Sequence, residues 1–251
     1  MNDKPQPHPK LAQIRAMLAK AEDPAATPEE RKAYNAKALK LMSKFGIERA
    51  MLAEKEPDSD KVGDRAVTIE GSYALERRAL LNEIARSLGA KVVYNPMRKV
   101  NGKKIYRIHL FGYASDLDRI EMLFASLSLQ ATNGLVDARP WVPGESVAAY
   151  RRSWLRGFTT EIGGRLRGAE KQAQTDAEEE RSGAGRSVAL VLADRKSIVE
   201  AAQARAYPKL GKAAKLPKLT GTGQRDGRAA GRRADIGGPR VEAAQRQAVS
   251  A

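Results

Sequence analysis

Apolar positions recur at helical spacing near the start of the chain. Leu11, Ile14 and Leu18 lie three or four positions apart, which predicts a first amphipathic helix. The segment Thr27–Glu30 predicts the start of a second helix, because it combines a capping threonine, a proline at the first helical position and a glutamate that completes a capping box. We expect this second helix to end at Gly46, in a left-handed conformation.

Further along, apolar and polar positions alternate in a way that predicts a small β-sheet. Residues 65–70 predict one short strand, and residues 91–100 and 103–111 predict two more on either side of Asn101–Gly102, the dipeptide most typical of a tight hairpin turn. Helices capped by Ser72 and Ser115 precede and follow this hairpin. The order strand, helix, hairpin, helix predicts a small α+β module with its helices on one face of the sheet.

The last part of the chain combines long helices with a basic end. We expect one helix over about residues 145–180 and another, capped by Asp194, that runs to about Tyr207. From residue 209 onward large apolar side chains are few, which predicts disorder. Four glycines within the first of these helices either let another helix approach closely or mark a break: Gly157, Gly163, Gly164 and Gly168.

Together these elements predict a mostly helical α+β protein. Its parts are an N-terminal helical hairpin, a small strand-helix-hairpin-helix module, a long helix and a disordered basic tail. The expected regions are a disordered leader over residues 1–9, a helical hairpin domain over 10–53, a linker over 54–64, the small α+β module over 65–139, a long-helix region over 140–208 and a basic flexible tail over 209–251.

The charge of the chain narrows the choice of partners. The 251 residues include 45 Lys and Arg against 30 Asp and Glu, a net charge of +15. Residues 205–240 alone hold ten basic and two acidic side chains, a net charge of +8. Such an excess attracts polyanions, above all nucleic acid, although a purely solubilising charge is the alternative. No signal peptide or membrane span is visible, so we expect a cytoplasmic protein without membrane contact.

Two short stretches near the N-terminus carry a family resemblance. They are Leu18–Pro24, which reads Leu-Ala-Lys-Ala-Glu-Asp-Pro, and Leu41–Ile47, which reads Leu-Met-Ser-Lys-Phe-Gly-Ile. With the residues around them, they resemble the bacterial and phage domain of unknown function 2786 family. The resemblance covers about the first fifth of the chain, and the later regions look like the companion region that often follows this hairpin. It implies a fold and not an activity, and it carries over no catalytic residue.

Candidate catalytic groups are few. The chain has no cysteine, which excludes disulfides, thiolate zinc sites and cysteine nucleophiles. His109 lacks paired carboxylates and more often fills a half-buried place. Asp116 and Asp118 could hold a metal as in a nuclease, but their place at a helix start also explains them. Gly221–Gly227 lacks the ending of a phosphate loop, so we interpret it as a flexible linker. We therefore assign no catalytic residue, metal ligand or cofactor.

Basic side chains gather at the hairpin turn, on the long helix and in the tail. A basic hairpin tip can follow phosphates, with Tyr94 and Tyr106 behind it for stacking, or it can be a solubilising turn. Arg151 and Arg165 fall near the apolar stripe of the long helix, where they could pair with buried carboxylates. The residues expected to contact nucleic acid are Arg98, Lys99, Lys103, Lys104, Arg152, Arg156, Lys212, Lys215, Lys218, Arg228, Arg232 and Arg233.

Three functional hypotheses remain open at this point. The first is a basic accessory protein that binds DNA or RNA through phosphate contacts and uses the N-terminal hairpin to dock a partner or another copy. The alternative is a protein-interaction or structural module of a phage or mobile element. The second alternative is a metal-dependent nuclease that uses Asp116 and Asp118.

Overall fold

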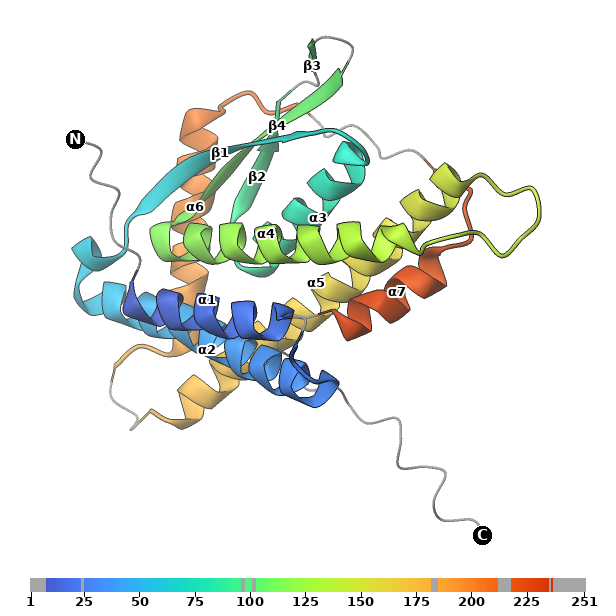
Figure 1. The fold of residues 1–251 in the computed structure, drawn as a ribbon. Coiled ribbons are helices and arrows are strands. Elements are labelled where there is room, and N and C mark those ends of the chain that lie inside the picture. The colour runs from blue at the N-terminus through green and yellow to red at the C-terminus, as the bar shows by residue number, and fades with distance from the viewer. Residues whose placement is uncertain are drawn as a thin grey trace, which may run out of the picture.

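The computed structural model describes residues 8–23, 25–95, 98–100, 103–181, 185–211, 218–234 and 236. Within these ranges the chain is mostly helical with one small antiparallel sheet (Figure 1). None of the described helices combines the length and the apolar content needed to cross a membrane. The elements in order are α1 (Pro9–Glu22), α2 (Pro28–Lys55), the short 3-10 helix η1 (Pro57–Ser59), β1 (Val62–Glu70), α3 (Ala74–Ser87), β2 (Lys91–Tyr94), β3 (Arg98–Val100), β4 (Lys103–Tyr113), α4 (Ala114–Val136), α5 (Val147–Glu179), α6 (Val188–Ala206) and α7 (Gln224–Arg233).

The sheet is built around β4, which pairs antiparallel with β1, β2 and β3. Val100 pairs with Lys103, so β3 and β4 form the predicted hairpin around Asn101–Gly102, two residues that lie outside the described ranges. The predicted strand over residues 91–100 is divided into β2 and β3. β1 begins at Val62 and therefore includes residues that the sequence assigned to a linker.

Helices cover both faces of the sheet: α3 and α4, the two helices of the predicted module, share one face as predicted, and α6 lies on the other. On β4, Tyr106, Ile108 and Leu110 belong to the main core, to which α3 and α4 also contribute. Phe111 and Tyr113 point to the other face, because side chains alternate along a strand. There they form a small second core with Val199 of α6. Figure 1 shows α6 crossing behind the sheet and α4 in front of it.

The N-terminal helical hairpin is confirmed, with a capping box at the start of α2. Thr27 Oγ1 accepts from the backbone N–H of Glu30 at 3.2 Å, and Glu30 Oε2 accepts from the backbone N–H of Thr27 at 2.9 Å. The predicted end of α2 at Gly46 is wrong, because the helix continues to Lys55. A Cβ at Gly46 would collide with the guanidinium of Arg119. This glycine therefore makes room for a buried side chain and does not stop the helix.

Three predicted caps are also wrong. Helices α3 and α4 begin after tyrosines: the cap of α3 is Tyr73, one residue later than Ser72, and the cap of α4 is Tyr113, two residues earlier than Ser115. Asp194 lies inside α6, whose cap is Ser187, accepting from the backbone N–H of Leu190 at 3.3 Å. The short apolar run before Asp194 therefore belongs to the same helix as the segment after it.

The hairpin shares one hydrophobic core with the rest of the protein. Leu11 and Met42 of the hairpin belong to the same buried cluster as Ile108 of the sheet and Trp154 of α5. The predicted linker over residues 54–64 is wrong, since it is folded into the end of α2, η1 and the start of β1. Asp60 within it is only 3 % exposed.

The predicted flexible tail over residues 209–251 is wrong for its middle part, where α7 lies along α5 (Figure 1). Few large apolar side chains are needed there, because the backbones approach closely at glycines. A Cβ at Gly227 would collide with the carbonyl of Trp154, and one at Gly157 would collide with the backbone of α7. The prediction that a long-helix glycine admits a neighbouring helix is therefore confirmed at Gly157. Tyr150 on α5 also donates to the carboxylate of Asp226 on α7.

Candidate binding pocket between α3 and α5

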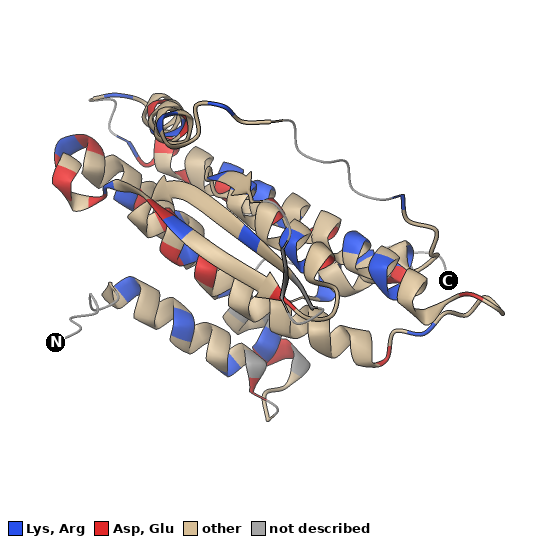
Figure 2. Ribbon diagram, turned by 90° about the horizontal axis from the view of Figure 1, so that it is seen from above, with Lys and Arg blue, Asp and Glu red and all other residues tan. Residues whose placement is uncertain are grey.

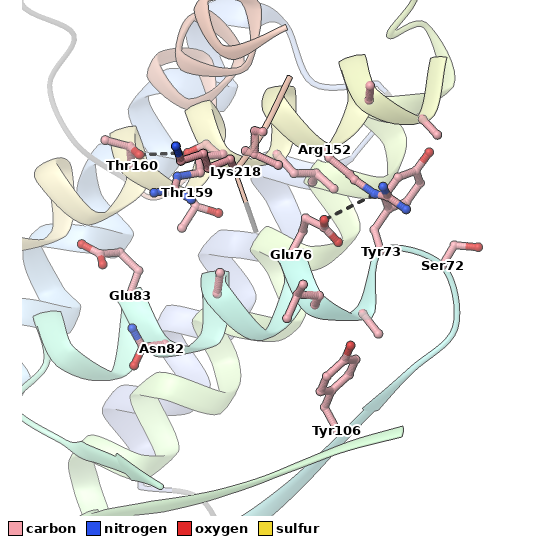
Figure 3. A pocket seen from close by; sticks show the side chains of 18 of the residues that line it. Ser72, Tyr73, Glu76, Asn82, Glu83, Tyr106, Arg152, Thr159, Thr160 and Lys218 are labelled. Atoms are coloured by element: carbon pink, nitrogen blue, oxygen red, sulfur yellow. Dashed lines mark hydrogen bonds and ion pairs between the residues drawn. The ribbon is translucent and has the colours of Figure 1, made fainter. Parts of the chain in front are cut away.

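A pocket of about 800 Å³ lies between α3 and α5. Residues 218–220, which precede α7, form part of its wall, and Tyr106 of β4 contributes at one end. Figure 3 shows the two helices facing each other, with Glu76, Asn82 and Glu83 on α3. Segments that are far apart in the sequence therefore meet at one site.

The α5 wall carries a polar stripe. Arg152, Arg156, Thr159 and Thr160 follow one another at intervals of four, three and one residues, so they share one face of the helix. Both arginines are exposed, and among the described residues no carboxylate pairs with Arg156. Gly157, which contacts α7, lies on a different side of α5. One side of α5 thus holds the helix α7, and another presents cations to the pocket.

The α3 wall carries two glutamates that tie it to α5. Glu83 pairs with Arg167, and a Cβ at Gly163 would collide with the Glu83 carboxylate, so this glycine lets the glutamate lie against α5. Glu76 approaches Arg152 at 3.7 Å. The side chains of Arg152 and Arg167 are 56 % and 57 % exposed, so these ion pairs are weak and leave the cations accessible.

Two tyrosines form the end of the pocket that Figure 3 shows on the right. Tyr73 has a positive φ of 54°, an uncommon conformation for a residue other than glycine. It directly precedes α3 and is held at the pocket's edge by the packing around it. Tyr106 is mostly buried, and the guanidinium of Arg78 lies 5.1 Å from its ring centre and 4.5 Å from that of Tyr94. The end of the pocket is therefore aromatic and fixed in place.

The pocket has an excess of positive charge. Its lining includes four cationic side chains, those of Arg152, Arg156, Arg167 and Lys218, and two carboxylates. Thr159, Thr160 and Asn82 add neutral hydrogen-bonding groups. A guanidinium presents several N–H donors that match phosphate or carboxylate oxygens. This combination is suited to a ligand that carries an anionic group and a planar polar part.

The structure brings some of the predicted nucleic-acid contacts together. Arg152, Arg156 and Lys218 line the pocket, whereas the arginines of α7 are exposed on the neighbouring helix and Arg232 reaches Glu161 at 3.7 Å. Figure 2 shows bands of Lys and Arg on the ribbons of both helices. Four other predicted contacts, Arg98, Lys99, Lys103 and Lys104, belong to β3 and β4, and their side chains are not described. Lys212 and Lys215 lie outside the described residues.

The two aspartates considered as metal ligands are held by arginines. Asp118 pairs with Arg65 at 2.6 Å, and Asp116 pairs with Arg119 at 3.0 Å and with Arg195 at 3.2 Å. Within the part of the chain that is described, no group of three or more His, Asp or Glu residues could hold a metal ion. Both carboxylates therefore act as partners in ion pairs.

Asp116 belongs to a buried polar network that joins four helices and the short segment between η1 and β1. Arg119, only 1 % exposed, also pairs with Glu170, which accepts from Ser43 at 2.8 Å. Arg195 pairs with Asp60 at 2.8 Å. Burial raises the pKa of Glu170, against the lowering effect of Arg119. Each of the two buried arginines thus meets two carboxylates, and the network connects the N-terminal hairpin to the C-terminal helices.

His109 lies between Asp64 and Tyr207. Its Nε2 contacts the Asp64 carboxylate, and its Nδ1 lies 2.9 Å from the Tyr207 hydroxyl. Phe111 packs against both rings. The half-buried place expected for His109 fits this arrangement, which ties the end of α6 to the sheet.

Arg151 and Arg165, the two arginines expected to lie near buried carboxylates, both donate to backbone carbonyls. Arg151 donates from Nε to the carbonyl of Ala138 at 3.2 Å, just beyond the end of α4. Arg165 donates to the carbonyls of Gly231 and Ala234 at 2.6 Å, at the end of α7. Both side chains thus satisfy acceptors that helix ends leave open, which the sequence could not reveal.

Several residues of the pocket were not anticipated. The spacing of Thr159 and Thr160 relative to Arg156 was visible in the sequence as a shared helix face. Tyr73 follows Gly71-Ser72, a turn signal that hints at an unusual backbone. Nothing in the sequence placed Asn82 opposite these residues, because that depends on how α3 packs on α5.

Comparisons with known proteins add information only at the N-terminus. No curated protein and no solved structure matches the chain. The matched segment begins in α1 and ends within α2, so it stops before the pocket and before most of the buried network. Over residues 10–49 the chain matches the family described as "Protein of unknown function (DUF2786)", in agreement with the resemblance seen in the sequence.

Proposed function

We propose that this protein binds nucleic acid through phosphate contacts made by α5, α7 and residues 218–220. The observation that carries the proposal is the meeting of Arg152, Arg156 and Lys218 in one pocket, although the lysine is more than sixty positions away in the chain. Opposing carboxylates are fewer than the cations there, and one of them approaches only to 3.7 Å. Cations that no close carboxylate neutralises are available to an anionic ligand.

The surface beside the pocket extends the possible contact. Helix α7 has four arginines among ten residues and one aspartate, and the aspartate is engaged by Tyr150. On the sheet, β4 begins at Lys103, three residues before Tyr106 in the pocket wall. At about 3.3 Å per residue, the hairpin tip begins roughly 10 Å along the strand from the pocket. A strand of nucleic acid could therefore contact more than one of these elements.

Binding measurements across a salt series test this proposal. Labelled DNA and RNA, single- and double-stranded, are titrated by fluorescence anisotropy between about 50 and 200 mM salt. We expect log Kd to change linearly with log salt. Arg152→Glu combined with Arg156→Glu should weaken binding and reduce the slope by about 1.4 to 1.8, the value for two lost phosphate contacts.

A matched control separates a local effect from a loss of net charge. Lys37 and Lys40 are exposed on α2 and do not line the pocket. The double variant Lys37→Glu/Lys40→Glu has the same net charge as the pocket variant and should retain nearly the full salt slope. Binding that ignores salt, or equal losses in both double variants, would contradict the proposal.

Exposed apolar side chains favour a second function, the docking of a protein partner. Leu129 and Val136 are seven positions apart on one face of α4, and both are mostly exposed. Trp141, in the loop that follows, is 74 % exposed. A partner that is retained after nuclease treatment and lost with Trp141→Ser would support this function. The metal-dependent nuclease is not proposed, because Asp116 and Asp118 are engaged by arginines.

A further inference from the structure

We infer that the pocket between α3 and α5 holds one unpaired nucleotide of a bound strand. The phosphate would lie against Arg152, Arg156 and Lys218, and the base would lie toward Tyr73 and Tyr106. This inference rests on the proposed function, because it names the part of the nucleic acid that enters the site. It implies a preference for single strands over duplex.

The dimensions of the pocket suit a single nucleotide. A volume of about 800 Å³ falls in the range of about 300 to 1,000 Å³ that small organic ligands occupy in proteins. A duplex keeps its bases stacked and paired, so its base faces cannot enter such a site without unpairing. An unpaired base needs no such step and enters at lower cost.

The two walls of the pocket differ in charge and hydrogen-bonding groups, as the phosphate and the base of a nucleotide do. Cations and threonine hydroxyls line the α5 side, while Asn82 and Glu76 lie on the α3 side (Figure 3). A phosphate needs cationic donors. The edge of a base offers both donors and acceptors, which an amide and a carboxylate can match. The Glu76–Arg152 pair at 3.7 Å is loose enough to be replaced by such contacts.

The aromatic end provides a surface for the base. Proteins that bind single strands stack successive bases on aromatic side chains, which tolerates any base sequence. The strained backbone of Tyr73 places its ring at the edge of the pocket, and Arg78 supports the ring of Tyr106 from outside the pocket lining. A ring held in advance loses little freedom when a base stacks on it.

Photo-crosslinking tests the inference on the intact protein. Single-stranded DNA and RNA oligonucleotides that carry 5-iodouracil are bound, irradiated and digested, and the crosslinked peptide is identified by mass spectrometry. We expect the crosslink at Tyr73 or Tyr106. In parallel, Tyr73→Leu should weaken single-strand binding about tenfold and leave duplex binding unchanged, whereas Tyr73→Phe should bind like the original protein.

The possible outcomes separate the two proposals. Crosslinks elsewhere, or equal affinity for single strands and duplex, would overturn the nucleotide pocket. If the Arg152→Glu/Arg156→Glu variant still lost affinity in that case, nucleic-acid binding would stand without it. If the original protein bound neither form at any salt concentration, both proposals would fail together.

Discussion

The arginines of the buried network and those of the pocket have the same side chain but differ in burial and in their pairing with carboxylates. Arg119 is almost fully buried and meets the carboxylates of Asp116 and Glu170. Arg156, on α5 as Glu170 is, is exposed, and no described carboxylate pairs with it. Near Glu170, α5 therefore uses charge to hold the fold together, and about four turns earlier, at Arg156, it presents charge to solvent.

The difference shows why a count of basic residues is a poor guide to function. A buried charge must be neutralised and hydrogen-bonded, so Arg119 and Arg195 cannot serve a ligand without disrupting the fold. An exposed cation without a close partner costs little to redirect toward a phosphate. Only the second class should contribute to binding, and the two classes should respond differently to substitution.

The largest expected effect is on stability and comes from Arg119. Arg119→Met leaves Glu170 and Asp116 in the interior without one of their partners, which should lower the free energy of unfolding by about 3 to 5 kcal/mol. Urea denaturation measures the change. The double variant Arg119→Met/Glu170→Met should recover part of the loss, because it removes one of the uncompensated carboxylates. A loss no larger in the single variant than in the double variant would show that the charges themselves do not matter.

A smaller effect is expected where α7 packs on α5. Gly227→Ala adds a Cβ that collides with the carbonyl of Trp154, so the helices must separate, at a cost of about 1 to 3 kcal/mol. Gly164→Ala is the matched control, because nothing lies within 4 Å of its added Cβ. Hydrogen exchange in α7 should accelerate in the first variant only. Unchanged exchange in Gly227→Ala would contradict the close packing described for α7.

The smallest effect is a dependence of α7 docking on alkaline pH. Burial, together with the hydrogen bond to Asp226, raises the pKa of Tyr150 to about 12. An unfolded tyrosine ionises near 10, so the contribution of the neutral phenol is complete below about pH 10 and is lost as the pH rises toward 12. Denaturation at several pH values should show this loss in the original protein and not in Tyr150→Phe. Parallel curves for the two proteins would exclude the linkage.

Local signals in the sequence were sufficient for much of the fold. The capping box at Thr27 and the Asn101–Gly102 turn involve neighbouring residues only, so the hairpin of helices and the hairpin of strands could both be predicted. The continuation of α2 beyond Gly46 and the presence of α7 could not be predicted from such local signals. The environment of Gly46 is set by Arg119 on another helix, and α7 is stabilised by glycines that pack on α5 although its own composition suggests disorder.

The candidate site was predictable in part for the same reason. Arg152 and Arg156 could be recognised as a pair on one helix face. The return of Lys218 to that face, and the presence of α3 opposite it, depend on tertiary packing that no local pattern records. Sequence therefore identified the cations but not the pocket that gathers them.

One paired measurement tests most directly whether the buried arginines stabilise the fold and the exposed arginines of α5 bind nucleic acid. The free energy of unfolding and the nucleic-acid affinity per folded molecule are measured for Arg119→Met and for Arg152→Glu/Arg156→Glu. We expect the first variant to lose stability and keep its affinity, and the second to lose affinity about tenfold or more and change stability by less than about 1 kcal/mol. Equal losses of affinity in both variants, or none in the second, would contradict the claim that the exposed arginines of α5 form the binding surface.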